Sequence, residues 1–210
     1  MITDIERFES LGDNCEFGFF LRDKGIETSS LFRWTLTHDI NNLEYIFSKN
    51  FEDLYLFENL EPAWQNMVLD KKYGLSFHTE MYSVNNEGIW EWEFDAEENL
   101  KIYSKEKEKI KYFLEKLRRS IMDDKKIFIL KSNDNNGYQG ALALSTYLEK
   151  NGRAKVLYVR SSENPDYSIT KINNHLYLAN IDRFAPYDRA NDYSNEGWTS
   201  ILTNAINEIN

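Results

Sequence analysis

The chain has 210 residues, of which 41% are hydrophobic and 15% aromatic, and its formal net charge is −10. This apolar content excludes a disordered chain, and the length suits one folded domain, which we expect to span residues 1–210. The excess of acids argues against nucleic acid as a partner, because phosphate binding gathers lysines and arginines on one face. No run approaches the roughly 20 apolar residues of a membrane span. With a single cysteine as well, the sequence predicts a cytoplasmic protein without a membrane span.

The N-terminal part predicts a strand followed by a helix. Residues 5–11 form a short mixed run that ends at Gly12. Asp13 and Asn14 are suitable N-cap residues, because their short polar side chains accept hydrogen bonds from free helical amides. The helix that they begin is expected to end at Gly25, a typical residue just beyond a helix C-terminus.

The next part of the chain predicts a helix and then a hairpin. A helix is expected over 39–48, whereas residues 51–57 fit either a strand or a helix. Residues 73–84 have an extended pattern, and in 89–94 tryptophan or phenylalanine alternates with glutamate. Since the turn sequence NNEG separates these two segments, the sequence predicts a β-hairpin around 75–94.

The second half predicts alternating helices and strands. An amphipathic helix over 103–122 precedes an apolar strand at 125–132, a helix at 138–152 and a strand at 153–161. A further strand at 175–181 and a helix at 196–209 follow. This order is typical of right-handed βαβ units, so we expect an α/β protein with three layers and a mainly parallel sheet.

Polar loops follow the predicted strands. Ligands of open parallel sheets bind at the carboxyl ends of the strands, where such loops meet. We therefore expect the functional site at these loops, with His78 as a further contributor from the end of its own strand. The loops are 11–15, 131–137, 160–166 and 182–188.

Cys15 is the first candidate for chemistry. It would lie in the opening turn of a helix, where free amides and the helix dipole favour a thiolate. A nucleophilic cysteine also needs a base, and the chain has three histidines, His38, His78 and His175. We expect His38 in a helix cap and His175 at the opposite end of the sheet, which leaves His78 as the partner. A buried cysteine that only fills space is the alternative.

Other residues would either orient the catalytic histidine or form a different kind of ligand site. Asp182 or Asn180, both at a strand end, would orient the imidazole. Arg183, beside aromatic residues, would bind an anionic or sugar ligand or belong to a structural ion pair. Trp34 would either pack in the core or contact the ligand. The sequence contains no metal-ligand spacing, no P-loop and no dinucleotide fingerprint, so neither a metal nor a cofactor is expected.

The segment SLGDNCEFGFFLRDKGIETSSLFRW (10–34) resembles the opening of a bacterial and viral family described as papain-like cysteine peptidases, a domain of unknown function. GLSFHTE (74–80) is similar to a later Phe-His element of that family. IDRFAPYDRANDYSNEGW (181–198) resembles the end of members associated with surface-polysaccharide loci. The resemblance covers nearly the whole chain.

The resemblance implies Cys15 as nucleophile and His78 as base, in a cysteine-dependent hydrolase or acyltransferase that acts on a small-molecule, glycan or peptide substrate. The alternative is a sugar-binding or nucleotide-sugar-binding protein, or a transferase, of surface-glycan assembly in which Cys15 is not catalytic. A domain that only binds a partner is the third interpretation. The candidate ligand-binding residues are Asp13, Asn14, Arg33, Trp34, Asn133 and Arg183.

Overall fold

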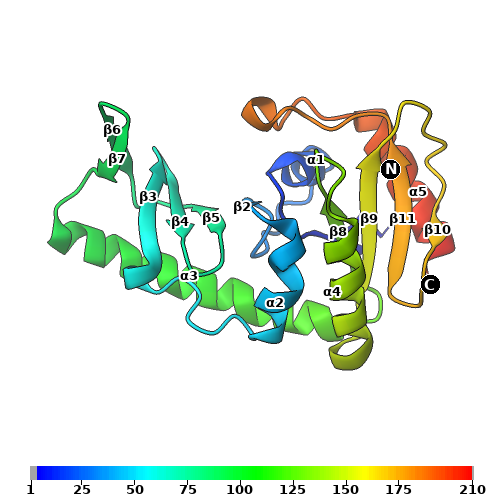
Figure 1. Ribbon diagram of the computed structural model, residues 1–210, viewed down its shortest axis with the longest axis horizontal. Coiled ribbons are helices and arrows are strands. Elements are labelled where there is room, and N and C mark those ends of the chain that lie inside the picture. Colours follow the sequence, from blue (N-terminus) through cyan, green and yellow to red (C-terminus); the bar gives the residue numbers. More distant parts are fainter. Residues whose placement is uncertain (1–3, 210) are drawn as a thin grey trace.

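A mainly parallel sheet, the central sheet of a three-layer arrangement, lies in the right-hand part of Figure 1. The computed structural model describes residues 4–209, and the five strands of this sheet have the order β1-β8-β9-β11-β10. β1, β8, β9 and β11 are parallel, whereas the edge strand β10 is antiparallel to β11. The predicted α/β class is therefore confirmed. The strands are β1 (Phe8–Ser10), β8 (Ile127–Lys131), β9 (Lys155–Ser161), β10 (Thr170–Lys171) and β11 (Leu176–Ile181).

Helices cover both faces of this sheet, which gives the predicted three layers. Along β8 successive side chains point to opposite faces, so Ile127 joins one core cluster and Phe128 the other. The cluster around Ile127 contains side chains of α1 and α5, and the cluster around Phe128 contains side chains of α2, α3 and α4. The helices are α1 (Glu16–Asp23), α2 (Leu43–Ser48), α3 (Ala96–Met122), α4 (Tyr138–Asn151) and α5 (Asn195–Glu208).

A second sheet and a hairpin occupy the middle of the chain. The second sheet is antiparallel, with the order β2-β5-β4-β3. The long helix α3 runs beside it and continues to the central sheet (Figure 1), so Ile110 and Leu117 of α3 join one core with Val68 of β4 and Phe128 of β8. The elements are β2 (Thr35–Thr37), β3 (Leu60–Trp64), β4 (Met67–Asp70), β5 (Leu75–His78) and the hairpin strands β6 (Ser83–Asn86) and β7 (Ile89–Trp92).

Four 3-10 turns complete the described secondary structure. They are η1 (Ile5–Arg7), η2 (Ile40–Asn42), η3 (Phe57–Asn59) and η4 (Tyr187–Arg189). Because η1 takes its first residues, the strand predicted over 5–11 is shortened to β1.

The predicted hairpin is smaller than expected. Only 83–92 of the expected 75–94 pair with each other, because Leu75–His78 instead forms β5 and joins the second sheet. Residues 51–57 form neither a strand nor an α-helix, since Phe51, Asp53 and Tyr55 have positive φ angles that belong to turns.

The connections after β1 and β8 leave the sheet in opposite directions. The chain enters α1 on one face after β1, and it enters α4 on the other face after β8. Since these two strands are parallel neighbours, their carboxyl ends form a topological switch point, the position at which open α/β sheets bind ligands.

Candidate functional site

A cavity of about 350 Å³ lies at this switch point. Loops that follow β1 and β8 contribute to its wall, together with the end of β2 and the segment around η4. We call it the strand-end cavity. Its lining residues are Asp13, Leu36, Thr37, His38, Asp39, Ile40, Ser132, Asp134, Asn136 and Tyr187. Three of the four loops expected from the sequence to meet at a site are therefore represented.

The backbone turns sharply where β1 ends. Gly12 and Asp13 both have positive φ angles, 91° and 74°. A side chain at Gly12 would overlap the Thr37 hydroxyl and lie against the Thr35 carbonyl, so only glycine fits between β1 and β2. Asp13 is a non-glycine residue in the left-handed region, a conformation that costs free energy and that accumulates at functional sites.

A buried ion cluster holds Asp13 in place. Lys131, at the end of β8, places its Nζ 2.8 Å from Asp13 Oδ2, 3.0 Å from Glu16 Oε2 and 2.7 Å from Asn133 Oδ1. The Lys131 side chain is 1% exposed and that of Glu16 is completely buried. The ammonium also lies 4.7 Å from the centre of the Phe184 ring. Three segments far apart in sequence thus meet at one lysine.

Glu16 and Tyr187 connect this cluster to the segment after β11. Glu16 accepts hydrogen bonds from Trp198 Nε1 at 2.9 Å and from the Ala185 amide at 3.1 Å. Tyr187 donates its hydroxyl to Asp13 Oδ1 at 2.8 Å. Burial and the adjacent Asp13 carboxylate raise the pKa of the Tyr187 phenol above its usual range. The phenol is therefore a donor throughout the physiological pH range.

Cys15 occupies the predicted position at the start of α1, where it is the N-cap residue. Its surroundings do not favour a thiolate, because burial raises the pKa of the thiol to about 11, and the Lys131 ammonium only partly opposes this effect. Cys15 Sγ makes no hydrogen bond with an imidazole among residues 4–209. The cysteine is half-buried beside the strand-end cavity and is not part of its lining.

The histidine at the strand-end cavity is His38 rather than His78. His38 Nε2 lies 2.9 Å from Ser76 Oγ, and the following residue, Asp39, caps η2 by accepting the Asn41 amide. The His-Asp pair at a helix start was correctly placed by sequence. Its proximity to Asp13 was missed, because it depends on β2 lying beside the turn at Gly12.

His78 ends β5 and lines a different cavity together with Trp34. Although His78 is an exposed residue, partial desolvation at this cavity lowers the pKa of its imidazole below the ordinary value of 6.5, and a hydrogen bond to the Asn66 backbone partly opposes the effect. In the pH range between the lowered pKa and about 6.5 the unfolded chain binds more protons at this position. His78 therefore makes stability fall as pH decreases through that range.

A titration of the histidine Cε1 protons by NMR tests this environment. The His78 resonance, assigned with a His78→Gln variant, is expected to titrate below pH 6.5. A midpoint at or above 6.5 would show that the imidazole is as solvated as in an unfolded chain.

The remaining predicted residues serve the structure. The buried Arg33 donates to the carbonyls of Thr28, Ile26 and Gly18. Asp182 accepts the hydroxyl of Ser194, the N-cap of α5, at 2.6 Å. Both contacts fix backbone segments and leave no ligand-binding face in the strand-end cavity.

Arg183 pairs with Asp192 at 3.2 Å, and both side chains are about half exposed. Asn180 accepts a hydrogen bond from Arg160 at 2.8 Å. Asn14 accepts the Glu16 amide and so helps to begin α1, whereas Asn133 donates to the Ala185 carbonyl. Asn133 thus acts on the site indirectly, because it accepts a hydrogen bond from the Lys131 ammonium that holds Asp13.

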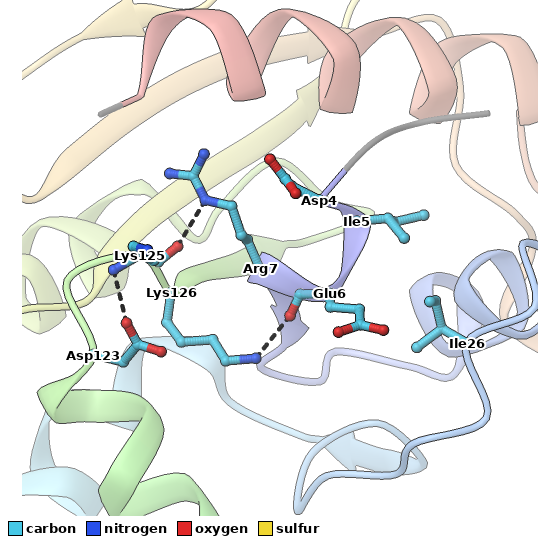
Figure 2. Close-up of a pocket in the computed structure, with 8 residues that line it drawn as sticks. All are labelled: Asp4, Ile5, Glu6, Arg7, Ile26, Asp123, Lys125 and Lys126. Carbon is cyan, nitrogen blue, oxygen red and sulfur yellow. Dashed lines mark hydrogen bonds between the residues drawn. The ribbon is translucent and has the colours of Figure 1, made fainter.

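A larger cavity, about 550 Å³, lies at the amino ends of β1 and β8. Figure 2 shows that two of its three cations bind backbone carbonyls: Lys126 donates to the Glu6 carbonyl and Arg7 to the Lys125 carbonyl. Arg7 also donates to the Ile209 carbonyl at 2.8 Å. These bonds tie the chain before β1 to the α3–β8 connection and to the end of α5, so we assign this region a structural role.

Within residues 4–209, no group of three or more His, Cys, Asp or Glu side chains is arranged to hold a metal ion. No helix in the same range has both the length and the apolar character needed to cross a membrane.

Comparison of the chain with protein-family models, with curated proteins and with solved structures finds no match. The function has to be inferred from the site itself, because a fold of this class supports many unrelated activities.

Proposed function

We propose that the protein binds a neutral, polyhydroxylated ligand, a sugar, in the strand-end cavity. The observation that supports this most directly is the chemistry of the lining. It offers three carboxylates, Asp13, Asp39 and Asp134, an imidazole and an amide, and it contains no lysine or arginine. Sugar hydroxyls donate well to fixed carboxylates, and such charge-assisted hydrogen bonds are stronger than neutral ones.

The same lining disfavours an anionic ligand. Lys131 contacts Asp13 of the lining, but its side chain is buried and already binds two carboxylates. Arg183 is paired with Asp192 outside the cavity. A nucleotide-sugar diphosphate would therefore face uncompensated carboxylates. Within the glycan-related alternative, the lining favours the sugar over the nucleotide-sugar.

The size and rigidity of the cavity support a small ligand. Its volume of about 350 Å³ is at the lower end of the range for small-molecule sites. Asp13 is fixed before binding by Lys131 and Tyr187, so little conformational entropy is lost when a ligand binds it. The exposed Tyr187 ring adds an apolar surface beside the polar groups.

The cysteine-dependent hydrolase or acyltransferase is a second proposal. Its support is the N-cap position of Cys15, next to the loop that contains Asp13. It requires His78, from another cavity, to reach the thiol, and it requires a thiolate in spite of burial. The pH dependence of thiol labelling at Cys15 tests it.

An Asp13→Asn variant tests the sugar-binding proposal. Asparagine has the same shape and tolerates positive φ, so the turn is preserved and only the carboxylate is lost. Thermal unfolding and calorimetry with glucose, galactose, N-acetylglucosamine and uridine diphosphate are the measurements. At least one sugar is expected to stabilise the wild-type protein, and the variant is expected to bind it at least about tenfold more weakly, the cost of a lost charged hydrogen bond.

Asp192→Asn is the matched control, because it removes a carboxylate from the segment between η4 and α5, outside the cavity. It is expected to bind the sugar as the wild type does. If none of the three sugars stabilises the wild type, or if Asp13→Asn binds with unchanged affinity, the proposal is wrong. Binding of uridine diphosphate alone would favour the nucleotide-sugar alternative.

A further inference from the structure

A second cavity, about 310 Å³ in volume, lies between the second sheet and α3. Three aromatic residues contribute to its walls: Trp34 precedes β2, Phe77 belongs to β5 and Phe113 belongs to α3. Ile110, one helical turn before Phe113, adds an aliphatic surface. We call it the aromatic cavity. The two cavities have no lining residue in common, but they are lined by consecutive parts of the chain. Trp34 and Thr35 line the aromatic cavity, and 36–40 line the strand-end cavity.

The aromatic side chains that line this cavity are fixed by contacts with neighbouring side chains. The Trp34 ring contacts Phe19 edge-on at a centroid distance of 5.2 Å, and the Arg22 guanidinium lies 5.6 Å from the same ring. Phe77 is 3% exposed and contacts Tyr55 edge-on at 5.5 Å. The walls are therefore formed before a ligand arrives, which lowers the entropic cost of binding.

The polar side chains of the aromatic cavity are three hydroxyls, one imidazole and one ammonium, from Ser29, Ser30, Thr35, His78 and Lys109. Lys109 is the cation of the lining, and it is paired at 2.6 Å with Glu106, a carboxylate that is almost fully buried. The Thr35 hydroxyl donates to the Leu31 carbonyl at 2.7 Å. His78 lies at the solvent side of the cavity, where its ring donates a hydrogen bond to the Asn66 backbone, so the other ring nitrogen of the neutral imidazole is left as an acceptor.

We infer that the aromatic cavity binds a planar heteroaromatic group, with its faces against the aromatic walls and its polar edge toward His78. Aromatic walls favour offset or edge-to-face contact with a flat ring, and such contacts add to the gain from burying the ring. Because the charge of Lys109 is neutralised by Glu106, the cavity does not favour a phosphate or carboxylate ligand. This site is independent of the sugar proposed for the strand-end cavity.

Indole and adenine are suitable probes, because both are planar and have polar edges. We expect each to shift the His78 Cε1 proton saturably in NMR titrations, through the ring current of the bound probe, with a Kd of about 1 mM or lower. The corresponding protons of His38 and His175 lie outside this cavity and should not move. Trp34→Leu is expected to weaken binding at least about tenfold, since it replaces a flat wall with a flexible one.

Phe113→Leu is the second variant, because Phe113 is only partly buried and leucine suits a helix, so folding should survive the change. Asp13→Asn is the matched control, and it should bind both probes like the wild type. This separates the inference from the proposed function, which can fail while the inference holds. Absence of any His78 shift up to about 10 mM probe, or shifts unaffected by both wall variants, would overturn the inference. Equal calorimetric affinity for non-planar cyclohexanol would overturn the planar specificity.

Discussion

Lys131→Met is expected to lower the free energy of unfolding by about 3–5 kcal/mol. The change keeps an unbranched side chain of similar length and removes only the ammonium. Asp13 and Glu16 then retain their hydrogen bonds to Tyr187, Trp198 and the Ala185 amide, but the charge that compensates both carboxylates is lost. Breaking a buried ion pair from one side costs far more than removing both partners, because a charge is left in a medium of low polarity.

Urea unfolding followed by circular dichroism measures this loss, and Lys111→Met is the matched control. Lys111 pairs with Glu108 on α3, with both side chains mostly exposed, so its loss should cost less than about 1 kcal/mol. Adding Glu16→Gln to Lys131→Met should recover part of the loss, since it removes one uncompensated charge. A cost for Lys131→Met as small as that of Lys111→Met would mean that the cluster contributes little to stability.

The sequence predicted the central sheet well because its signals are local. The strand expected at 125–132 is β8, and the helix expected at 138–152 is α4. Both are apolar or amphipathic runs bounded by polar or glycine residues, so their periodicity indicates their type without knowledge of the fold. The start of α3 has a local signal as well. Asp95 and Glu98 form a capping pair that begins α3 well before the expected residue 103.

The second sheet could not be predicted in the same way. β3 contains Pro62, a residue that disfavours strands, and β2 has three residues. Such short strands are stabilised by pairing with partners distant in sequence, as β2 is with β5. The sequence correctly predicts that Leu75–His78 is extended. It does not identify the strands that pair with this segment, because alternation along one strand contains no information about the strand beside it.

In the candidate site, too, some features follow from the sequence and others depend on the tertiary fold. That polar loops meet at the strand ends follows from the topology of parallel sheets, and the strand-end cavity agrees with it. The burial of Lys131 could not be anticipated, since a lysine at the end of a strand ordinarily reaches solvent. Its partner Asp13 is 118 positions away in the sequence. Charged clusters of this kind arise only when the tertiary fold brings the segments together.

Cys15 is expected to react with thiol reagents about 100 times more slowly in the folded protein than in the unfolded chain near neutral pH. Burial raises the pKa of the thiol from 9.0 to about 11, a difference of about two pH units, and the thiolate fraction falls by a factor of ten for each unit. The measurement is the labelling rate with iodoacetamide between pH 6 and 10, followed by mass spectrometry. The same protein in urea is the control, because it has the same single cysteine without the burial.

The shape of the pH profile distinguishes the two proposals for this protein. A buried, protonated thiol gives a rate that rises about tenfold per pH unit and does not level off below pH 10. A nucleophile paired with His78 gives fast labelling that levels off near neutral pH, and His78→Gln then slows it. That second outcome would support the hydrolase or acyltransferase. With the first outcome, Cys15→Ser is expected to bind sugar as the wild type does, because the cysteine does not line the strand-end cavity and the carboxylate of Asp13 is held there by Lys131 and Tyr187.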